Sequence, residues 1–431
     1  MTPSRRRVLA ATASALAAGL AGCTSETGPA TDPTDTTEPP TGTTDPGDDS
    51  SLGDPEVLWT ADVGPATTNA PLVVDGTVYV GSDAGPGIDS GDESGHHLHA
   101  FAATDGAERW SYETDKPVGG RPTVTADGIY VTGGYDRGTA GIDYELFALT
   151  RDGDERWRFV DDRLSAWYTV CGVVDGTVFV GSNDDAIGPG AYAAGVATDD
   201  GATRWTAEFG DVVGGLPLAD RCLLPSPTGL HAVDSDGSVA WTYEGAEPLD
   251  FFAADPEVVA GSVLVEADGL VSLDPESGAV NWRYGSPESY VTRRVTVGDH
   301  LVARTYDGGL VSLDPATGDE RWTDDGLSQG YGLAAVGDGR FAVQTPDAFE
   351  VRTSENEVVG SFEPSGTHPS VSGAGGALFV AGRERGRLDA YDADGEGLWT
   401  IEPTNEIGGF AAVDGTAYVT TVDGSCHALA L

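Results

Sequence analysis

Three of the seven histidines in this 431-residue chain fall within four positions, as His96, His97 and His99. Imidazole nitrogens and carboxylate oxygens are common ligands of divalent metal ions, so this acidic and histidine-rich stretch is the first place to seek metal chemistry. The acidic insertion at residues 83–97 lacks the ligand spacing of an EF-hand loop. The sequence leaves two alternatives for this insertion, a solvated acidic loop and a cation-binding loop, and it assigns no metal ligand.

The four cysteines, Cys23, Cys171, Cys222 and Cys426, are widely separated. No two are adjacent and none forms a Cys-x-x-Cys pair, so the pattern supports neither a zinc knuckle nor a redox dithiol. Three of them lie in the body of the chain. Those three are either all free and buried, or two of them form a disulfide and one is left over.

Motifs of hydrolases and nucleotide-dependent enzymes are missing from the sequence. It contains no Gly-x-Ser-x-Gly, no His-Glu-x-x-His and no phosphate-binding loop. Neighbouring carboxylates carry little information about catalysis, because 70 residues are Asp or Glu. We therefore name no catalytic residue and expect a protein that is not an enzyme.

The first residues have the pattern of an export signal followed by a lipid attachment site. Residues 4–9 (SRRRVL) resemble a twin-arginine motif, the apolar run 8–20 is too short for a stable span, and residues 20–23 (LAGC) resemble a lipobox. These resemblances imply a signal peptide at residues 1–22, cleavage before Cys23 and a lipid on its thiol. The alternative is an uncleaved N-terminal anchor helix, which also leaves the rest of the chain outside the cytoplasm.

Residues 23–54 are rich in Thr, Pro and Gly, with eight acidic residues and no basic one, so we expect a disordered tether behind the lipidated cysteine. The whole chain carries 70 acidic and 23 basic residues, a formal net charge of -47. Such a charge is tolerated where salt near about 1 M shortens the Debye length to ~3 Å. It argues against nucleic-acid binding and indicates a salt-loving organism, which we take to be a haloarchaeon.

A repeat of about forty residues runs through the body, residues 55–431. Each unit reads as four short strands: an alternating strand ending at a turn such as Asp75-Gly76, a β-branched and aromatic strand, a third of the form apolar-x-Ala/Ser-apolar, and a fourth with a tryptophan. In seven units a glycine stands four residues before the tryptophan. These pairs are Gly106 and Trp110, Gly153 and Trp157, Gly201 and Trp205, Gly237 and Trp241, Gly278 and Trp282, Gly318 and Trp322, and Gly395 and Trp399.

One unit departs from the pattern, because Asn356 replaces the turn glycine and Gly360 the tryptophan; Phe362 is the best-placed partial substitute. The chain ends after a third strand, whereas the body begins with a fourth strand carrying Trp59, so joining the ends completes a unit. Closure removes exposed sheet edges and predicts an all-β propeller of four-stranded blades. Nine units are counted from Trp59, Trp110, Trp157, Trp205, Trp241, Trp282, Trp322, Gly360 and Trp399.

The unit from Leu310 to Trp322 resembles the tryptophan-docking repeat of pyrroloquinoline-quinone-type propellers, and the resemblance covers almost all of residues 55–431. It implies eight blades, the usual number in that family, against nine by repeat count. The family includes quinoprotein dehydrogenases and a non-enzymatic lipoprotein of the outer-membrane β-barrel assembly machine. The dehydrogenases hold pyrroloquinoline quinone between a tryptophan and a ring of two adjacent cysteines, near calcium. Since no cysteines are adjacent here, we expect the non-enzymatic type, with neither cofactor supported by residues.

The repeat separates the three histidines. His99 occupies the variable position of a third strand, which makes it a strand residue rather than a metal ligand. Other units have Phe147, His231, Asp389 and His427 at that position. By contrast, His96 and His97 close the insertion between the second and third strands of the first unit.

The first three units carry insertions at the same place. Because equivalent loops of adjacent blades emerge on one face, we expect a shared binding face there. Trp167, which lies outside the repeat, is either an anchor for binding or a filler of the central channel. The candidate residues of this face are His96, His97, Tyr135, Arg163, Trp167 and Tyr168.

These features predict a lipoprotein on the outer face of the cell membrane, whose propeller is a protein-interaction scaffold in high salt. We expect its partner to be another membrane or cell-surface protein, and the propeller itself to be a monomer. Two alternatives stay open: an extracytoplasmic receptor for a small ligand, and a quinone-dependent dehydrogenase.

Overall fold

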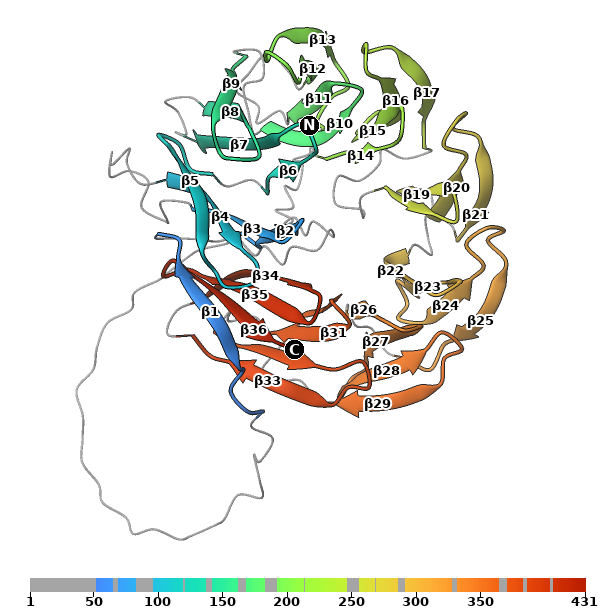
Figure 1. Cartoon of the computed structure of the whole chain (residues 1–431). Coiled ribbons are helices and arrows are strands. Elements are labelled where there is room, and N and C mark those ends of the chain that lie inside the picture. Colours follow the sequence, from blue (N-terminus) through green and yellow to red (C-terminus); the bar gives the residue numbers. More distant parts are fainter. Residues whose placement is uncertain are drawn as a thin grey trace, which may run out of the picture.

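The chain forms a ring of β-sheets. The computed structural model describes residues 52–64, 69–82, 96–118, 121–136, 142–161, 168–182, 192–212, 214–245, 256–267, 269–285, 291–327, 332–363, 370–382, 386–403 and 406–431. Within these residues every regular element is a strand, and no helix meets the length and apolarity that a membrane span requires. The strands build nine four-stranded sheets, which are the blades of a β-propeller (Figure 1).

The blades are numbered here in chain order. Blade 1 contains β2 (Leu72–Val74), β3 (Thr77–Gly81), β4 (His96–Ala102) and β5 (Glu108–Thr114). Blade 2 contains β6 (Thr123–Val124), β7 (Ile129–Asp136), β8 (Ile142–Leu149) and β9 (Glu155–Phe159). Blade 3 contains β10 (Tyr168–Val174), β11 (Thr177–Ser182), β12 (Ala193–Ala197) and β13 (Thr203–Ala207). Blade 4 contains β14 (Leu216–Pro217), β15 (Arg221–Ser226), β16 (Gly229–Asp234) and β17 (Val239–Tyr243). Blade 5 contains β18 (Glu257–Val259), β19 (Ser262–Ala267), β20 (Gly269–Leu273) and β21 (Val280–Tyr284).

The remaining blades complete the ring. Blade 6 contains β22 (Val291–Val297), β23 (His300–Thr305), β24 (Leu310–Leu313) and β25 (Glu320–Asp324). Blade 7 contains β26 (Leu333–Gly337), β27 (Arg340–Gln344), β28 (Phe349–Thr353) and β29 (Val358–Phe362). Blade 8 contains β30 (Ser370–Ala374), β31 (Ala377–Ala381), β32 (Leu388–Tyr391) and β33 (Gly397–Ile401). Blade 9 contains β34 (Ile407–Val413), β35 (Thr416–Thr421), β36 (Ser425–Ala430) and β1 (Val57–Asp62).

The first hairpin of several blades has the turn that its sequence predicts. Asp75 and Gly76, with φ of 49° and 67°, join β2 to β3 in the left-handed conformation that a two-residue hairpin needs. The same turn occurs at residues 175–176 and 414–415. Asp127-Gly128 also joins two strands, but neither residue has a positive φ there, so its turn is of another type.

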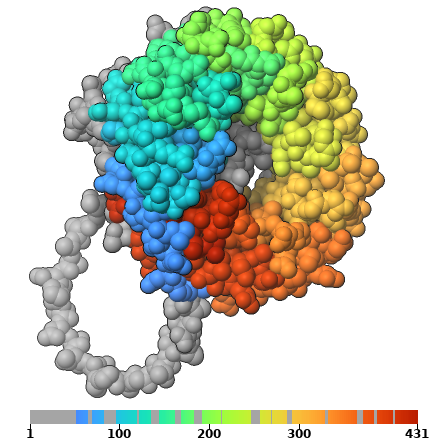
Figure 2. Space-filling model, in the orientation of Figure 1, coloured from blue at the N-terminus to red at the C-terminus, as the bar shows by residue number. Residues whose placement is uncertain are grey.

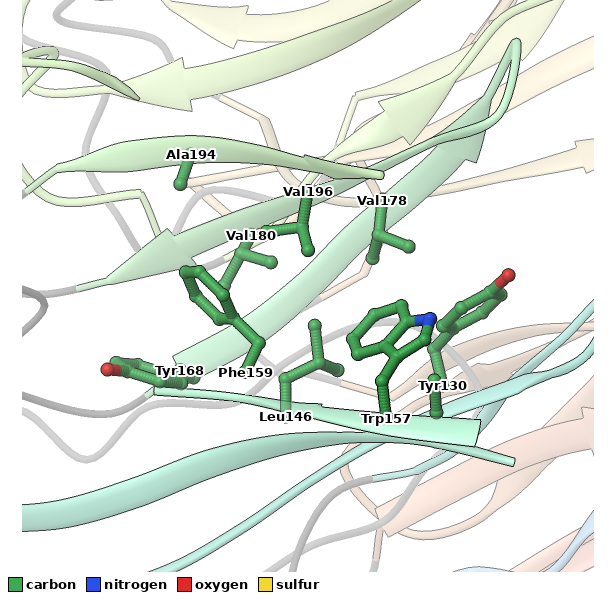
Figure 3. Packing of buried hydrophobic residues seen from close by; sticks show 10 residues of the cluster. Tyr130, Leu146, Trp157, Phe159, Tyr168, Val178, Val180, Ala194 and Val196 are labelled. Carbon is green, nitrogen blue, oxygen red and sulfur yellow. The ribbon is translucent and has the colours of Figure 1, made fainter. Parts of the chain in front are cut away.

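In every blade except blade 7, a tryptophan on the outermost strand docks on the next blade. The Trp157 indole N–H of blade 2, for example, donates to the Thr198 carbonyl oxygen of blade 3 at 2.9 Å, and its ring packs against Gly201. Figure 3 shows this ring among the aliphatic side chains of both blades. Equivalent indole bonds are made by Trp59, Trp110, Trp205, Trp241, Trp282, Trp322 and Trp399. The turn glycine therefore serves the tryptophan of the preceding blade, not the one four residues after it.

Each tryptophan also needs a small neighbour within its own blade. Trp157 lies opposite Ala148 and Trp322 opposite Ser312 in the strand register. This explains the Ala/Ser of the third strand, because a small side chain leaves room for the indole ring. In blade 7 the sizes are exchanged, since Val351 lies opposite Gly360.

The seam between blades 7 and 8 replaces the missing tryptophan with two residues. Phe362 supplies the aromatic ring, which stacks on Tyr391 at a centroid distance of 3.9 Å. Arg340 supplies the hydrogen bond, because its Nη1 donates to the Ala393 carbonyl oxygen at 3.2 Å, the position that an indole N–H reaches elsewhere. Phe362 was predicted to substitute for the tryptophan, and it does replace the packing of the indole ring. The hydrogen bond of the indole is replaced by Arg340, which was not predicted.

The ends of the chain close the ring. β1 pairs with β36, so blade 9 takes its outermost strand from the N-terminal side and its other three from the C-terminus. Figure 2 shows the corresponding blue and red sectors in contact. Gly53 accepts a hydrogen bond from Thr400 N at 3.0 Å, which ties the segment before β1 to blade 8. The structure confirms the propeller and the count of nine blades, and the family norm of eight is wrong for this chain.

Candidate functional site

The three sequence insertions begin and end at equivalent strand ends. In blades 1, 2 and 3 they connect the second strand to the third, after Ser82, Asp136 and Ser182. In a propeller these ends of adjacent blades lie on the same face of the ring. The insertions themselves, at 83–95, 137–141 and 183–191, lie outside the described residues, whereas the strands that flank them are described.

A serine holds the base of two of these insertions. Ser82 Oγ accepts a hydrogen bond from His97 N at 2.7 Å, and Ser182 Oγ accepts one from Tyr192 N at 3.1 Å. The carbonyl oxygens of the same serines accept bonds from Val118 N and Val212 N of the connectors to the next blade. The described residues that flank these two insertions are therefore held together by hydrogen bonds and tied to the connector that follows.

The structure corrects the prediction that His96 and His97 close a loop. They belong to β4, opposite Thr114 and Glu113 of β5, so they are strand residues and not the end of a loop. The His96 side chain is buried, and the His97 ring lies 5.2 Å from the ring of His99. The sequence pattern missed this because the repeat was aligned from Leu98, although strands of long hairpins extend as far as pairing allows.

His99 is a strand residue, as predicted. Its Nδ1 lies 3.0 Å from Glu108 Oε1, and its ring stacks on Phe101 at 5.6 Å. Burial lowers the pKa of His99, and the hydrogen bond to Glu108 only partly opposes this effect. A neutral, packed imidazole fits a structural role.

Tyr168, a predicted face residue, is used inside the protein. Its side chain is buried at the seam of blades 2 and 3 (Figure 3), and its hydroxyl donates to the Asp161 carbonyl oxygen at 2.8 Å. Tyr135 lies in β7, where it pairs with Asp143. The other two candidates, Arg163 and Trp167, lie outside the described residues, as does Cys23.

The body cysteines are free and buried in the structure, which favours the first of the two alternatives for Cys171, Cys222 and Cys426. Burial raises the pKa of Cys426 to about 12, so this thiol is inert at neutral pH. Within the described residues, no group of three or more His, Cys, Asp and Glu is arranged to hold a metal ion. The acidic insertion 83–95 lies outside that part of the chain, so its cation binding stays a hypothesis.

Among the described residues, we find no site that fits a quinone. Such a cofactor would need a free tryptophan face beside an adjacent-cysteine ring, but the eight repeat tryptophans are hydrogen-bonded into the seams between blades. Cys171 and Cys222 belong to different blades, with Cys222 Sγ 3.7 Å from the Cys171 carbonyl oxygen. We derive no chemistry through a quinone.

Sequence reasoning missed a Ser-His-Glu arrangement at the seam of blades 6 and 7. His300 Nδ1 lies 2.8 Å from Ser312 Oγ, and its Nε2 lies 3.2 Å from Glu355 Oε1. These are the partners of a nucleophilic triad. However, Ser312 is 0% exposed and lies opposite Trp322 in the sheet, so no substrate reaches its hydroxyl. The arrangement fixes the seam instead.

The closed ring and its docked tryptophans define a pyrroloquinoline-quinone-type β-propeller. The chain matches the family model described as outer membrane protein assembly factor BamB over residues 51–205 and 189–346. Since these matches cover more than half of the 431 residues, the chain belongs to this family. A comparison with curated proteins finds no match.

Solved structures share the fold at low sequence identity. BamB from Moraxella catarrhalis is 18% identical with a TM-score of 0.50, covering 72% of this chain and 94% of that one. The computationally designed Ika8 protein is 11% identical with a TM-score of 0.52, covering 88% and 99%. The quinohemoprotein alcohol dehydrogenase ADHIIG from Pseudomonas putida HK5 is 14% identical with a TM-score of 0.49, covering 88% and 76%. At these identities the likeness extends to the fold alone.

Proposed function

We propose that this protein is a non-enzymatic lipoprotein on the outer face of the cell membrane, whose propeller is a scaffold for another membrane or cell-surface protein in high salt. The observation that carries the proposal is the match over residues 51–346 to a family described as an outer membrane protein assembly factor. By analogy, this chain would help to assemble or hold proteins at its own membrane. The proposal rests on this analogy with the family, because a fold by itself does not determine a function.

The described residues support a scaffold over an enzyme. Groups that look catalytic, such as Ser312 with His300, are buried and engaged between blades. The face of blades 1 to 3 has two insertions with fixed bases, an arrangement suited to present loops to a partner. The binding face proposed for this partner is that of His96, His97, Tyr135, Arg163, Trp167 and Tyr168, with the buried His96 and Tyr168 acting as supports.

The scaffold is tested by cross-linking in native membranes. Full-length protein is compared with a variant in which residues 84–94 are replaced by a short Gly-Ser link, which keeps the Ser82 to His97 bond. The matched control is Arg321→Ala, at the opposite end of the strands. We expect one partner to be cross-linked by the wild type and the control and lost from the shortened variant. An identical set of products from all three would contradict the proposed face.

The anchor and the cofactor are tested separately. Cys23→Ser should move the protein from the membrane fraction to the medium, and retention in the membrane would contradict lipid anchoring. Pyrroloquinoline quinone with calcium ions, added to the purified protein in molar salt, should change neither the absorbance spectrum nor the thermal midpoint. Stoichiometric binding of the quinone would contradict the scaffold proposal and favour a quinone-dependent dehydrogenase.

A further inference from the structure

The residue just before the docking tryptophan is an arginine in four blades, and it has the same function in each. Its guanidinium reaches across the outer strand to the first hairpin turn of its own blade. In blade 1, Arg109 Nη1 donates to Thr77 Oγ1 at 2.6 Å, and in blade 3, Arg204 Nη1 donates to Thr177 Oγ1 at 2.6 Å. Arg156 and Arg321 make equivalent bonds to Asp127 and Asp299. These four blades therefore have a charged outer rim at the hairpin end of the ring.

Five blades lack this arginine: blade 4 has Ala240 there, blade 5 has Asn281, and the three consecutive blades 7, 8 and 9 have a larger aliphatic residue. Val359 of blade 7, Leu398 of blade 8 and Leu58 of blade 9 stand where the arginine would be, and the residues before the first and last of them are Val358 and Val57. All five side chains are exposed, with fractions of 41%, 36%, 49%, 55% and 54% in that order. Val239 of blade 4 and Val280 of blade 5 are exposed as well, at 45% and 40%, but they stand singly beside Ala240 and Asn281. Single exposed aliphatic side chains are ordinary, whereas blades 7 to 9 have a valine or leucine at the arginine position itself in three neighbouring blades.

The exposed residues belong to neighbouring blades. Strands β29, β33 and β1 follow one another around the ring (Figure 1). Leu52 lies against Gly397 of β33 and packs on the apolar cluster of blades 7 and 8. Val413, in the first hairpin of blade 9, is 37% exposed. We define the aliphatic rim as Val57, Leu58, Val358, Val359, Leu398 and Val413.

We propose that two copies of this chain associate through the aliphatic rim. A partner must cover aliphatic groups without burying charge, which is difficult in a chain with 70 acidic and 23 basic residues. The same rim on a second copy meets this requirement, and a two-fold axis makes one patch cover the other. This proposal replaces the expectation of a monomer.

The free edges of the outermost strands suggest how two copies would pair. The outermost strand of a blade has one unpaired edge, which is available for another extended chain. The edge of β33 already accepts the segment before β1, through the bond from Thr400 N to Gly53 O at 3.0 Å. Other blades have such an edge too, but that of the neighbouring β29 begins with the exposed Val358 and Val359, which makes it the edge we assign to a second copy.

The position of the N-terminal segment adds a concentration effect. Residues 1–51 join the propeller at Leu52, beside the aliphatic rim. If Cys23 is lipidated, as proposed above, two copies in one membrane hold their rims at the ends of equal tethers, which raises their effective concentration. Only this argument rests on the proposed function; the aliphatic patch and the open edge do not.

The test is the association state of lipid-free, full-length protein carrying Cys23→Ser, measured by sedimentation equilibrium in molar NaCl. The rim variant Val358→Glu/Val359→Arg installs the Glu-Arg pair that blade 1 has at Glu108 and Arg109. The matched control, Val239→Glu/Ala240→Arg, makes the same net-neutral change in blade 4, away from the rim. Thermal midpoints check that both variants are folded.

We expect a concentration-dependent dimer for the wild type and the control, and a dissociation constant at least about tenfold weaker for the rim variant. A wild type that is monomeric at every concentration would overturn the proposal, as would a dimer that the rim variant leaves unchanged. Equal loss of the dimer in both variants would place the interface elsewhere. Because no lipid is present, failure of this test is independent of the anchor test with Cys23→Ser.

Discussion

At the scale of single residues, the repeat is a set of paired size constraints. The turn glycine must be small because the indole of the preceding blade packs on its backbone, and the third-strand Ala or Ser must be small because an indole lies opposite it. Both constraints are visible in the sequence as spacings. Their partners are not, since the glycine pairs with a tryptophan in the neighbouring unit, and spacing within a unit cannot distinguish the two.

The docking constraint predicts unequal costs for two Gly→Ala substitutions in blade 6. Gly318 and Gly298 both have positive φ, 75° and 62°, but a Cβ on Gly318 would lie 2.6 Å from the Trp282 ring, whereas one on Gly298 would meet nothing within 4 Å. Gly298→Ala should cost about 1 kcal/mol of unfolding free energy through its backbone conformation alone. Gly318→Ala should cost about 2 kcal/mol more. Urea unfolding of both variants in molar salt measures the difference, and equal costs would contradict the docking explanation.

His99 predicts a pH dependence of stability. Burial lowers its pKa in the folded protein below the ordinary value of 6.5, so the unfolded chain binds a proton more readily as the pH falls through about 6.5. Stability should therefore be complete above that pH and decline below it. His99→Phe, which installs the residue found at position 147, should flatten the decline in the urea midpoint between about pH 7.5 and pH 5.5. The same slope in both proteins would show that the folded state does not disfavour the His99 cation.

At the scale of elements, the blades were predictable and one of their seams was not. Alternation, Asp-Gly turns and tryptophan spacing predicted four strands per unit and nine units, because these signals are local. The length of β4 was not predictable, since His96 and His97 extend it by pairing with β5, which depends on the partner strand. Likewise, Arg340 of blade 7 donates a hydrogen bond to Ala393 of blade 8, and no sequence pattern within blade 7 indicates that contact.

The seam of blades 7 and 8 predicts that restoring the consensus residue is harmful. A Cβ on Gly360 would overlap the carbonyl oxygen of Asp394, because the turn of blade 8 lies directly on this glycine. Gly360→Trp should therefore destabilise the protein by about 3 kcal/mol or more, although eight other blades have tryptophan there. Gly53→Ala is the control, since its Cβ would meet nothing within 4 Å. A higher thermal midpoint for Gly360→Trp would mean that the seam can open to accept the ring.

At the scale of the whole molecule, the nine blades form a closed ring because the N-terminal strand β1 completes blade 9. The contact that closes it joins residues far apart in sequence, such as Thr60 with His427 in the register of β1 and β36. The sequence predicted this closure because the last unit lacks the strand that precedes the first. What it could not predict is the contact of Leu52 and Gly53 with β33 of blade 8, since these residues have no repeat signature.

Closure predicts a sharp boundary for N-terminal truncation. A chain that starts at Leu52 keeps β1, the Trp59 bond to the Ala103 carbonyl oxygen and the Gly53 bond to blade 8, so its thermal midpoint should match that of the longer protein. A chain that starts at Gly64 exposes the edge of β36 and leaves the turn at Gly106 without its indole. It should aggregate or unfold at a much lower temperature, because an open edge and a lost seam weaken both neighbours of the gap. A synthetic peptide of residues 52–63 should restore part of the midpoint when added in excess, through the same strand pairing. Full stability of the shorter chain without this peptide would mean that eight complete blades suffice and that closure by β1 contributes little to the fold.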